Sequence, residues 1–180
     1  MNLSLVTAES FDEVMRFYTP TIYRIALTRL RNPTDAEDIT QDVFVRYFKA
    51  DLTYESEEHR KAWLLRCAVN CANTAASTAE RRHRDDSAEL EKLASLIADP
   101  NTPEEAADRD EQRGEILKAV MSMKPKYRTV IYLFYYEELS TAQIAEVTKT
   151  REATVRSQLA RAREALKKVL QKNYGFNNNT

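Results

Sequence analysis

The residues best suited to chemistry lie near the C-terminus, in a stretch rich in lysine and arginine. Apolar residues after Glu152 recur every three or four positions, which predicts a helix reaching about Lys172. Its opposite face carries Ala153, Arg156, Ser157, Ala160 and Arg161. Small side chains let a backbone sit deep in a groove, and arginine pairs with guanine edges or phosphates. A solvated basic face is the alternative, but eight Lys/Arg against two Glu over 149–172 favour DNA.

A shorter predicted helix precedes the basic one. Ser140 lies three residues before Gln143, a capping-box spacing that starts a helix running to about Thr148. A short polar turn, 149–152, then separates the two helices. A helix, a tight turn and a basic helix in this order favour a helix-turn-helix that binds duplex DNA.

A second polar surface is acidic and lies on a predicted helix running from Thr34 to about Lys49. Thr34 and Glu37 have capping-box spacing, and an acidic first turn suits the positive end of the helix dipole. The exposed face there carries only acids and amides: Asp35, Glu37, Asp38, Gln41 and Asp42. Dipole complementarity explains Asp35, while the rest favour docking on a basic protein surface.

A third polar surface follows on a predicted helix from about His59 to Arg82. Its exposed side is expected to present Arg60, Lys61, Arg66, Asn70, Asn73, Thr74 and Ser77, ahead of a basic cluster at 81–84. This face is basic and amide-rich, which suits a nucleic-acid strand. Trp63 fits either the core or stacking on an unpaired base.

The elements that position these surfaces are predicted to be helices throughout. Only two glycines and five prolines occur in 180 residues, which argues against sheets and tight hairpins. Segment 11–30 has a helical apolar period, and Pro20 within it predicts a kink or break near Tyr18–Thr19. Two more helices are expected, from Pro103 to about Met123 and over 127–138. The predicted fold class is therefore all-α.

Charge is segregated along the chain, although the net charge is only −1. Residues 85–115 hold eleven acidic side chains against three basic ones. Prolines and low hydrophobicity make 85–103 a predicted acidic linker with at most a short helix around 88–97. It would join an N-terminal domain at 8–84 to a C-terminal domain at 104–172, with a tail at 173–180.

Other function classes find little support in these residues. Neither a catalytic Ser/His/Asp set nor a glycine-rich phosphate loop is present, so an enzyme is not expected. Cys67 and Cys71 are predicted to be buried small residues rather than metal ligands or a disulfide, so no metal or cofactor is expected. The lack of a long apolar run and of a signal peptide predicts a cytoplasmic protein without membrane insertion.

Four motifs together resemble one protein family. They are DAEDITQDVFVRYF at 35–48, KAWLLRCAVNCAN at 61–73, MKPKYRTVIYLFYYEELSTAQIA at 123–145 and TVRSQLARAREALKK at 154–168. In this order and spacing they are similar to the extracytoplasmic-function (ECF) sigma factors of the sigma-70 family. A stand-alone helix-turn-helix regulator is the runner-up, but it leaves the acidic face and segment 61–73 without a task.

The resemblance implies a division of labour. Docking on core RNA polymerase would fall to Glu37, Asp38, Gln41 and Asp42. Recognition and melting of the promoter −10 element would fall to Arg60, Lys61, Trp63, Arg66, Asn70, Asn73 and Ser77. Recognition of the −35 element as duplex would fall to Arg151, Glu152, Thr154, Arg156, Ser157, Gln158 and Arg161. The family also implies an anti-sigma factor as partner, and a monomer when free.

The chain departs from the family pattern at the turn between its last two helices. A glycine is usual there, and Lys149 occupies the position. If the turn needs a positive φ, a non-glycine residue costs roughly 1 kcal/mol. Thr74, Ala75, Thr150 and Gln158 are further departures, which bear on the bases that are read.

Overall fold

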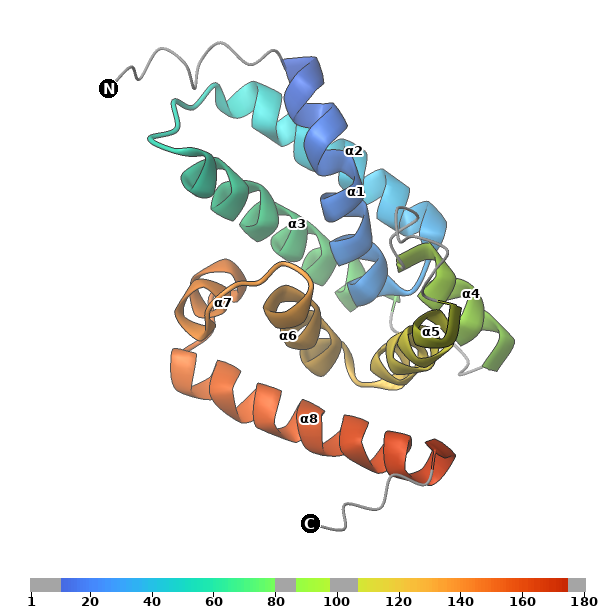
Figure 1. Cartoon of the computed structure of the whole chain (residues 1–180). Helices are drawn as coiled ribbons and strands as arrows, with labels where there is room; N and C mark the ends of the chain where they lie inside the picture. Colours follow the sequence, from blue (N-terminus) through green and yellow to red (C-terminus); the bar gives the residue numbers. More distant parts are fainter. Residues whose placement is uncertain (1–10, 80–86, 98–106, 175–180) are drawn as a thin grey trace.

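A computed structural model describes residues 11–79, 87–97 and 107–174, and every element within these ranges is an α-helix (Figure 1). The helices are α1 (Phe11–Leu30), α2 (Pro33–Ala50), α3 (Glu57–Ala79), α4 (Ser87–Ile97), α5 (Ala107–Ser122), α6 (Pro125–Tyr135), α7 (Thr141–Thr148) and α8 (Glu152–Tyr174). The all-α prediction is confirmed. The predicted end of α3 near Arg82, the start of the fifth helix at 103 and most of the tail lie outside the described residues.

Helix α1 runs through Pro20 without interruption, so of the predicted kink or break near Tyr18–Thr19 the break is wrong, and the kink stays a prediction. Tyr18 and Ile22 are both buried, one on each side of the proline. Their packing against α2 and α3 offsets the ~3 kcal/mol that a proline costs inside a helix. The Tyr18 hydroxyl also donates to the Glu57 carboxylate at the start of α3.

Helix α2 begins before the predicted capping box. Asn32 is the N-cap, and its side-chain oxygen accepts a hydrogen bond from the Asp35 backbone N–H at 3.1 Å. Pro33 follows at the first helical position, where its fixed φ and missing N–H carry no penalty. The predicted Thr34/Glu37 cap is therefore wrong, because Asn-Pro starts the helix earlier.

The acidic segment contains a packed helix. Helix α4 buries Leu90, Leu93, Ala94 and Ile97, and it lies against α5 and α1. The predicted short helix around 88–97 is confirmed, and its apolar face belongs to the same core as the rest of the described chain. Residues 80–86 and 98–106, on either side of it, lie outside the described residues.

The N-terminal and C-terminal halves share that core. Helices α1, α2 and α3 pack together, and α6 and α7 lie against α1 and α3 respectively (Figure 1). Apolar contacts continue from Leu27 and Leu65 in the first half to Ile131 and Ile144 in the second. The helix-turn-helix is therefore docked on the N-terminal half.

A buried arginine fastens the two halves. Arg128 of α6 is 3% exposed, and its guanidinium donates to the carbonyls of Thr28 (2.7 Å) and Arg29 (2.9 Å) in the last turn of α1. It also donates to Met123 (2.7 Å) and Met121 (3.4 Å) at the end of α5. The last carbonyls of a helix lack intrahelical partners and carry partial negative charge, so a cation there is stabilising.

Replacing this guanidinium should destabilise the whole molecule. Arg128→Ala leaves several buried carbonyls without donors, which is expected to lower the free energy of unfolding by about 2–4 kcal/mol. Urea unfolding followed by circular dichroism measures the change. Lys126→Ala, an exposed cation on the same helix, is the matched control and should change stability by less than about 0.5 kcal/mol. Equal effects of the two substitutions would contradict the role of Arg128.

Candidate nucleic-acid interface

The helix-turn-helix has the local geometry that its sequence predicts. The Ser140 hydroxyl accepts from the Gln143 backbone N–H (3.1 Å), and the Gln143 side chain accepts from the Ser140 backbone N–H (2.8 Å). Both halves of the capping box are thus present. Lys149 has φ 52°, in the left-handed region, and Thr150 N–H closes the end of α7 on the Ala145 carbonyl at 2.9 Å. The turn therefore places a non-glycine residue at a positive φ, at a cost of roughly 1 kcal/mol.

The polar face of α8 is open to solvent. Val155, Leu159 and Ala162 are buried against the rest of the molecule. The predicted duplex-contacting residues that are exposed are Arg151, Thr154, Arg156, Ser157 and Arg161. The small residues Ala153 and Ala160 lie exposed between them, so a groove could approach this face closely.

Two members of the predicted duplex-contacting set are less available. Gln158 is half-buried. Glu152 accepts hydrogen bonds from Thr141 (2.6 Å) and Arg156 (2.7 Å). The Thr141 hydroxyl and then the Arg156 guanidinium hold the pKa of Glu152 below its ordinary value. Glu152 therefore ties α7 to α8 and orients Arg156.

Arg60 does not lie on the exposed face of α3, where the sequence placed it. Its side chain is 2% exposed, pairs with Glu57 at 3.0 Å and lies 5.9 Å from the centre of the Tyr54 ring. The helix starts at Glu57, and the chain before it brings Tyr54 over this first turn. The predicted exposure of Arg60 is therefore wrong, and its cation supports the fold.

Two other predicted −10 residues of α3 face the C-terminal half. Lys61 pairs with Glu137, in the segment after α6, at 3.3 Å, and Arg66 pairs with Glu146 of α7 at 2.8 Å. Both cations are about one-third exposed. The structure therefore brings the helix-turn-helix against part of the −10 surface that the sequence predicted.

The remaining predicted −10 residues divide by exposure. Trp63 is half-buried, with ring centres 5.9 Å from Tyr47 and 6.4 Å from Tyr54, which supports the core alternative for it. Asn70 is half-buried, while Asn73 and Ser77 are exposed farther along α3. The exposed amide and hydroxyl are the more accessible members of this face.

The acidic face of α2 is presented as predicted. Glu37, Asp38, Gln41 and Asp42 are all exposed, and Asp42 has an ion pair with Arg46 of the same helix at 4.0 Å. Sequence reasoning missed an apolar continuation of this face. Val45 is 49% exposed and Phe48 is 68% exposed. The clue was that Phe48 follows Gln41 by seven residues, two helical turns, and so falls outside the core stripe.

Within the described residues, no group of three or more His, Cys, Asp or Glu side chains is arranged to hold a metal ion. None of the described helices combines the length and the apolar character needed to cross a bilayer. The surfaces with defined chemistry are thus the basic face of α8, the polar face of α3 and the acidic face of α2.

Comparisons with known proteins identify two family regions. Residues 14–82 match the model of sigma-70 region 2, and residues 113–166 match the model of sigma-70 region 4. The ECF RNA polymerase sigma factor SigW of Bacillus subtilis is 29% identical over 167 residues, covering 90% of this chain and 89% of the relative. The RNA polymerase sigma-H factor of Pseudomonas aeruginosa is also 29% identical, covering 90% of this chain and 86% of its own.

Solved structures share the fold. The sigma factor RpoE from Bartonella quintana, solved with the anti-sigma factor NepR, superposes with a TM-score of 0.63 at 20% identity, covering 91% of this chain and 98% of that one. CnrH, solved with the cytosolic domain of CnrY, gives a TM-score of 0.63 at 20% identity and covers 95% of this chain and 96% of that one. At this level of identity the likeness extends to the helical architecture alone.

Breaking the ion pairs between α3 and the C-terminal half should loosen their contact. Glu137→Lys with Glu146→Lys places like charges opposite Lys61 and Arg66, and each partly exposed pair contributes at most about 1 kcal/mol. Hydrogen exchange of α3 and α7 amides is therefore expected to rise severalfold.

The control for this loosening is Glu164→Lys. Glu164 pairs only loosely, at 3.9 Å, with Lys168 of its own helix, and both side chains are exposed. Exchange in α3 should stay unchanged in this variant. Unchanged exchange in the double variant as well would show that these two ion pairs do not hold the halves together.

Proposed function

We propose, from the premise that this chain belongs to the extracytoplasmic-function group of the sigma-70 family, that it directs core RNA polymerase to a specific set of promoters. Sigma factors are not enzymes; they act by binding. The observation that carries the proposal is the presence of regions 2 and 4 in one chain, each with a polar face suited to DNA.

The −35 element would be read as duplex by α8. Arg151, Arg156 and Arg161 are exposed, with Arg156 and Arg161 on either side of the small residues of α8, and Thr154 and Ser157 add hydroxyls. Arginine guanidinium groups can form two hydrogen bonds with a guanine edge or a phosphate. Small side chains in the middle of the exposed face let the helix enter the major groove. The Arg156–Glu152–Thr141 contacts hold one of these arginines in place before DNA arrives.

The −10 element would be bound by α3 as separated strands. Asn70, Asn73 and Ser77 offer hydrogen bonds to base edges, and Lys61 and Arg66 offer positive charge to the backbone. Capturing unstacked bases offsets the few kcal/mol that unpairing each base costs. Melting would then be driven by binding energy, with no catalytic group.

Core polymerase would dock on α2. Four exposed acid and amide side chains, Glu37, Asp38, Gln41 and Asp42, suit a basic partner surface, and the family resemblance points to a coiled coil of the polymerase clamp. Exposed Val45 and Phe48 extend the surface with apolar area that a helical partner would bury.

The free chain would need to open before α3 engages DNA. Lys61 and Arg66 form ion pairs with Glu137 and Glu146, so promoter strands would compete with these carboxylates for the two cations. Polymerase binding that separates the two halves would release both cations. This fits a factor that acts on promoters only as part of the polymerase, and that is monomeric when free.

An anti-sigma factor is a further partner in this proposal. RpoE and CnrH were each solved with an anti-sigma factor or with a cytosolic partner domain. The alternative function, a stand-alone helix-turn-helix regulator, is not favoured, because it leaves the acidic face of α2 and the polar face of α3 without a function.

Transcription in vitro with core polymerase tests the proposal. With a genomic promoter library, added chain should yield transcripts from a defined subset of promoters, and core enzyme alone should not. Arg156→Ala with Arg161→Ala should lower these transcripts at least about tenfold, since a good arginine–base contact contributes about 1–3 kcal/mol. The control is Lys167→Ala with Lys168→Ala, which removes two exposed cations of the same helix. Full activity of the Arg156/Arg161 variant would overturn the assignment of α8.

Charge reversal on α2 tests the docking surface. Asp38→Lys with Asp42→Lys should raise the Kd for core polymerase at least about tenfold, because both carboxylates would face a basic partner. The stability of the chain should be retained, since both side chains are exposed. Fluorescence anisotropy with labelled chain measures the affinity. Glu91→Lys, an exposed reversal on α4, should bind as the unmodified chain does. Equal affinities for all three would remove the role of α2.

A further inference from the structure

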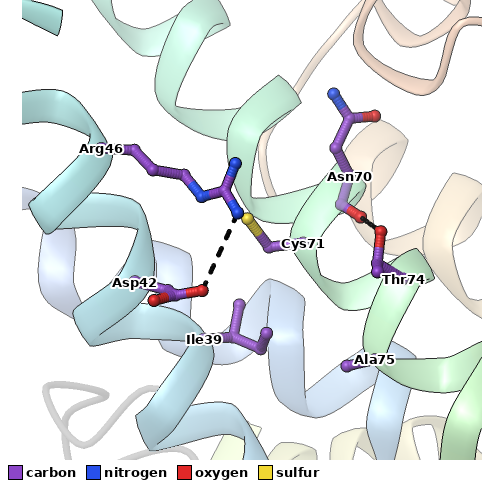
Figure 2. Close-up of a pocket in the computed structure, with 7 residues that line it drawn as sticks. All are labelled: Ile39, Asp42, Arg46, Asn70, Cys71, Thr74 and Ala75. Atoms are coloured by element: carbon purple, nitrogen blue, oxygen red, sulfur yellow. Dashed lines mark hydrogen bonds and ion pairs between the residues drawn. The ribbon is translucent and has the colours of Figure 1, made fainter.

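A cleft between α2 and α3 contains a thiol that promoter binding does not use. Its volume is about 290 Å³, and its walls include Cys71 and Asn70 of α3 and Asp42 and Arg46 of α2. Figure 2 shows the guanidinium of Arg46 beside the sulfur of Cys71, with its ion pair to Asp42. A thiol that lines a cleft together with a cation is placed to react with a small molecule.

A second thiol lies one helical turn away. Cys67 and Cys71 are four residues apart on α3, both are reduced, and their side chains hydrogen-bond each other. Cys67 is half-buried and Cys71 is 8% exposed. The pair therefore combines a reactive position in the cleft with a neighbour close enough to take part in the reaction.

The surroundings favour the thiolate on Cys71. The hydrogen bond from Cys67 lowers the pKa of Cys71 most, burial opposes it, and Arg46 lowers it further. The same hydrogen bond and burial raise the pKa of Cys67, which keeps its proton. Asp42 acts against Arg46 at both sulfurs, because its negative charge disfavours a thiolate.

We propose that Cys71 is a site of reversible oxidation by a hydroperoxide, with Cys67 as the resolving thiol. The Cys71 thiolate attacks one peroxide oxygen, the O–O bond breaks, and the products are a Cys71 sulfenic acid and hydroxide or alkoxide. The Cys67 sulfur then attacks the Cys71 sulfur, an S–S bond forms, and the S–O bond breaks. The hydroxyl group leaves with the Cys67 proton as water. Two electrons pass from the two thiols to the peroxide.

The resulting disulfide is strained, which makes it readily reversible. Side chains four apart on a helix have Cβ atoms about 5–6 Å apart, whereas a disulfide holds them at about 3.5–4.5 Å. Closing this gap distorts the turn, and strained disulfides are the easily reduced ones. A cellular thiol pool would therefore restore the dithiol once the peroxide is gone.

Distortion of this turn would reach the proposed −10 surface. Arg66 and Asn70 directly precede the two cysteines in the chain. Contracting the turn would rotate both polar side chains away from their present positions. The effect on transcription rests on the proposed function, whereas the thiol chemistry does not.

Peroxide treatment of the full chain, followed by intact-mass analysis, tests the site. The chain should lose two hydrogens, and a thiol reductant should return them. Cys67→Ser should stop at a sulfenic acid that dimedone traps on Cys71. Cys71→Ser should leave Cys67 severalfold less reactive than Cys71 is in Cys67→Ser, because burial still raises the pKa of Cys67 and this thiol does not line the cleft. Arg46→Gln should slow oxidation, by up to about tenfold for each unit by which the pKa of Cys71 rises.

Two results would overturn the site: equal peroxide reactivity of Cys67 and Cys71 in the single variants, or no disulfide in the folded chain. Circular dichroism establishes that each variant is folded, and Cys71→Ala replaces Cys71→Ser if the serine variant is not. Transcription is the separate second readout. Oxidised chain should be at least about tenfold less active and recover on reduction. Unchanged activity with the disulfide formed would overturn the coupling to α3, and inactivity in both redox states would overturn the proposed function alone.

Discussion

One buried guanidinium sets the arrangement of this molecule. Arg128 of α6 reaches the terminal carbonyls of α1 and those at the end of α5, so that three helix ends meet at one side chain. Moving α6 away from α1 would leave both the cation and the carbonyls to find new partners. Because α6 carries the helix-turn-helix, this contact also decides where the DNA-binding unit sits.

Because of where the helix-turn-helix lies, the two proposed DNA-binding surfaces of the molecule differ in how exposed they are. The basic face of α8 is exposed, and the helix packs against α5, α6 and α7. The polar face of α3 is partly covered, because Glu137 and Glu146 neutralise Lys61 and Arg66. These ion pairs are partly exposed to solvent and each contributes at most about 1 kcal/mol, so opening them costs little against polymerase and promoter contacts. The same helix α3 carries Cys71, which lines the cleft toward α2.

Local rules were reliable where a few neighbouring residues decide the conformation. The Ser140–Gln143 capping box and the left-handed Lys149 both depend on atoms within about one helical turn. The predicted start of α2 was wrong, also because of neighbouring residues: Asn32 and Pro33 begin the helix earlier than Thr34 would. The break predicted at Pro20 does not occur for a different reason: core packing on both sides of the proline outweighs the local cost of a proline inside a helix.

The sequence by itself determined the helical class and most polar faces, because amphipathic periodicity and capping are encoded in residues a few positions apart. The family came from the resemblance of four motifs. Only the tertiary structure decided which of these faces are free. Arg60 is a basic residue on a polar helix, yet Tyr54 and Glu57 bury it. Lys61 and Arg66 meet carboxylates about 80 positions away. Such pairings depend on how helices cross, which no local pattern specifies.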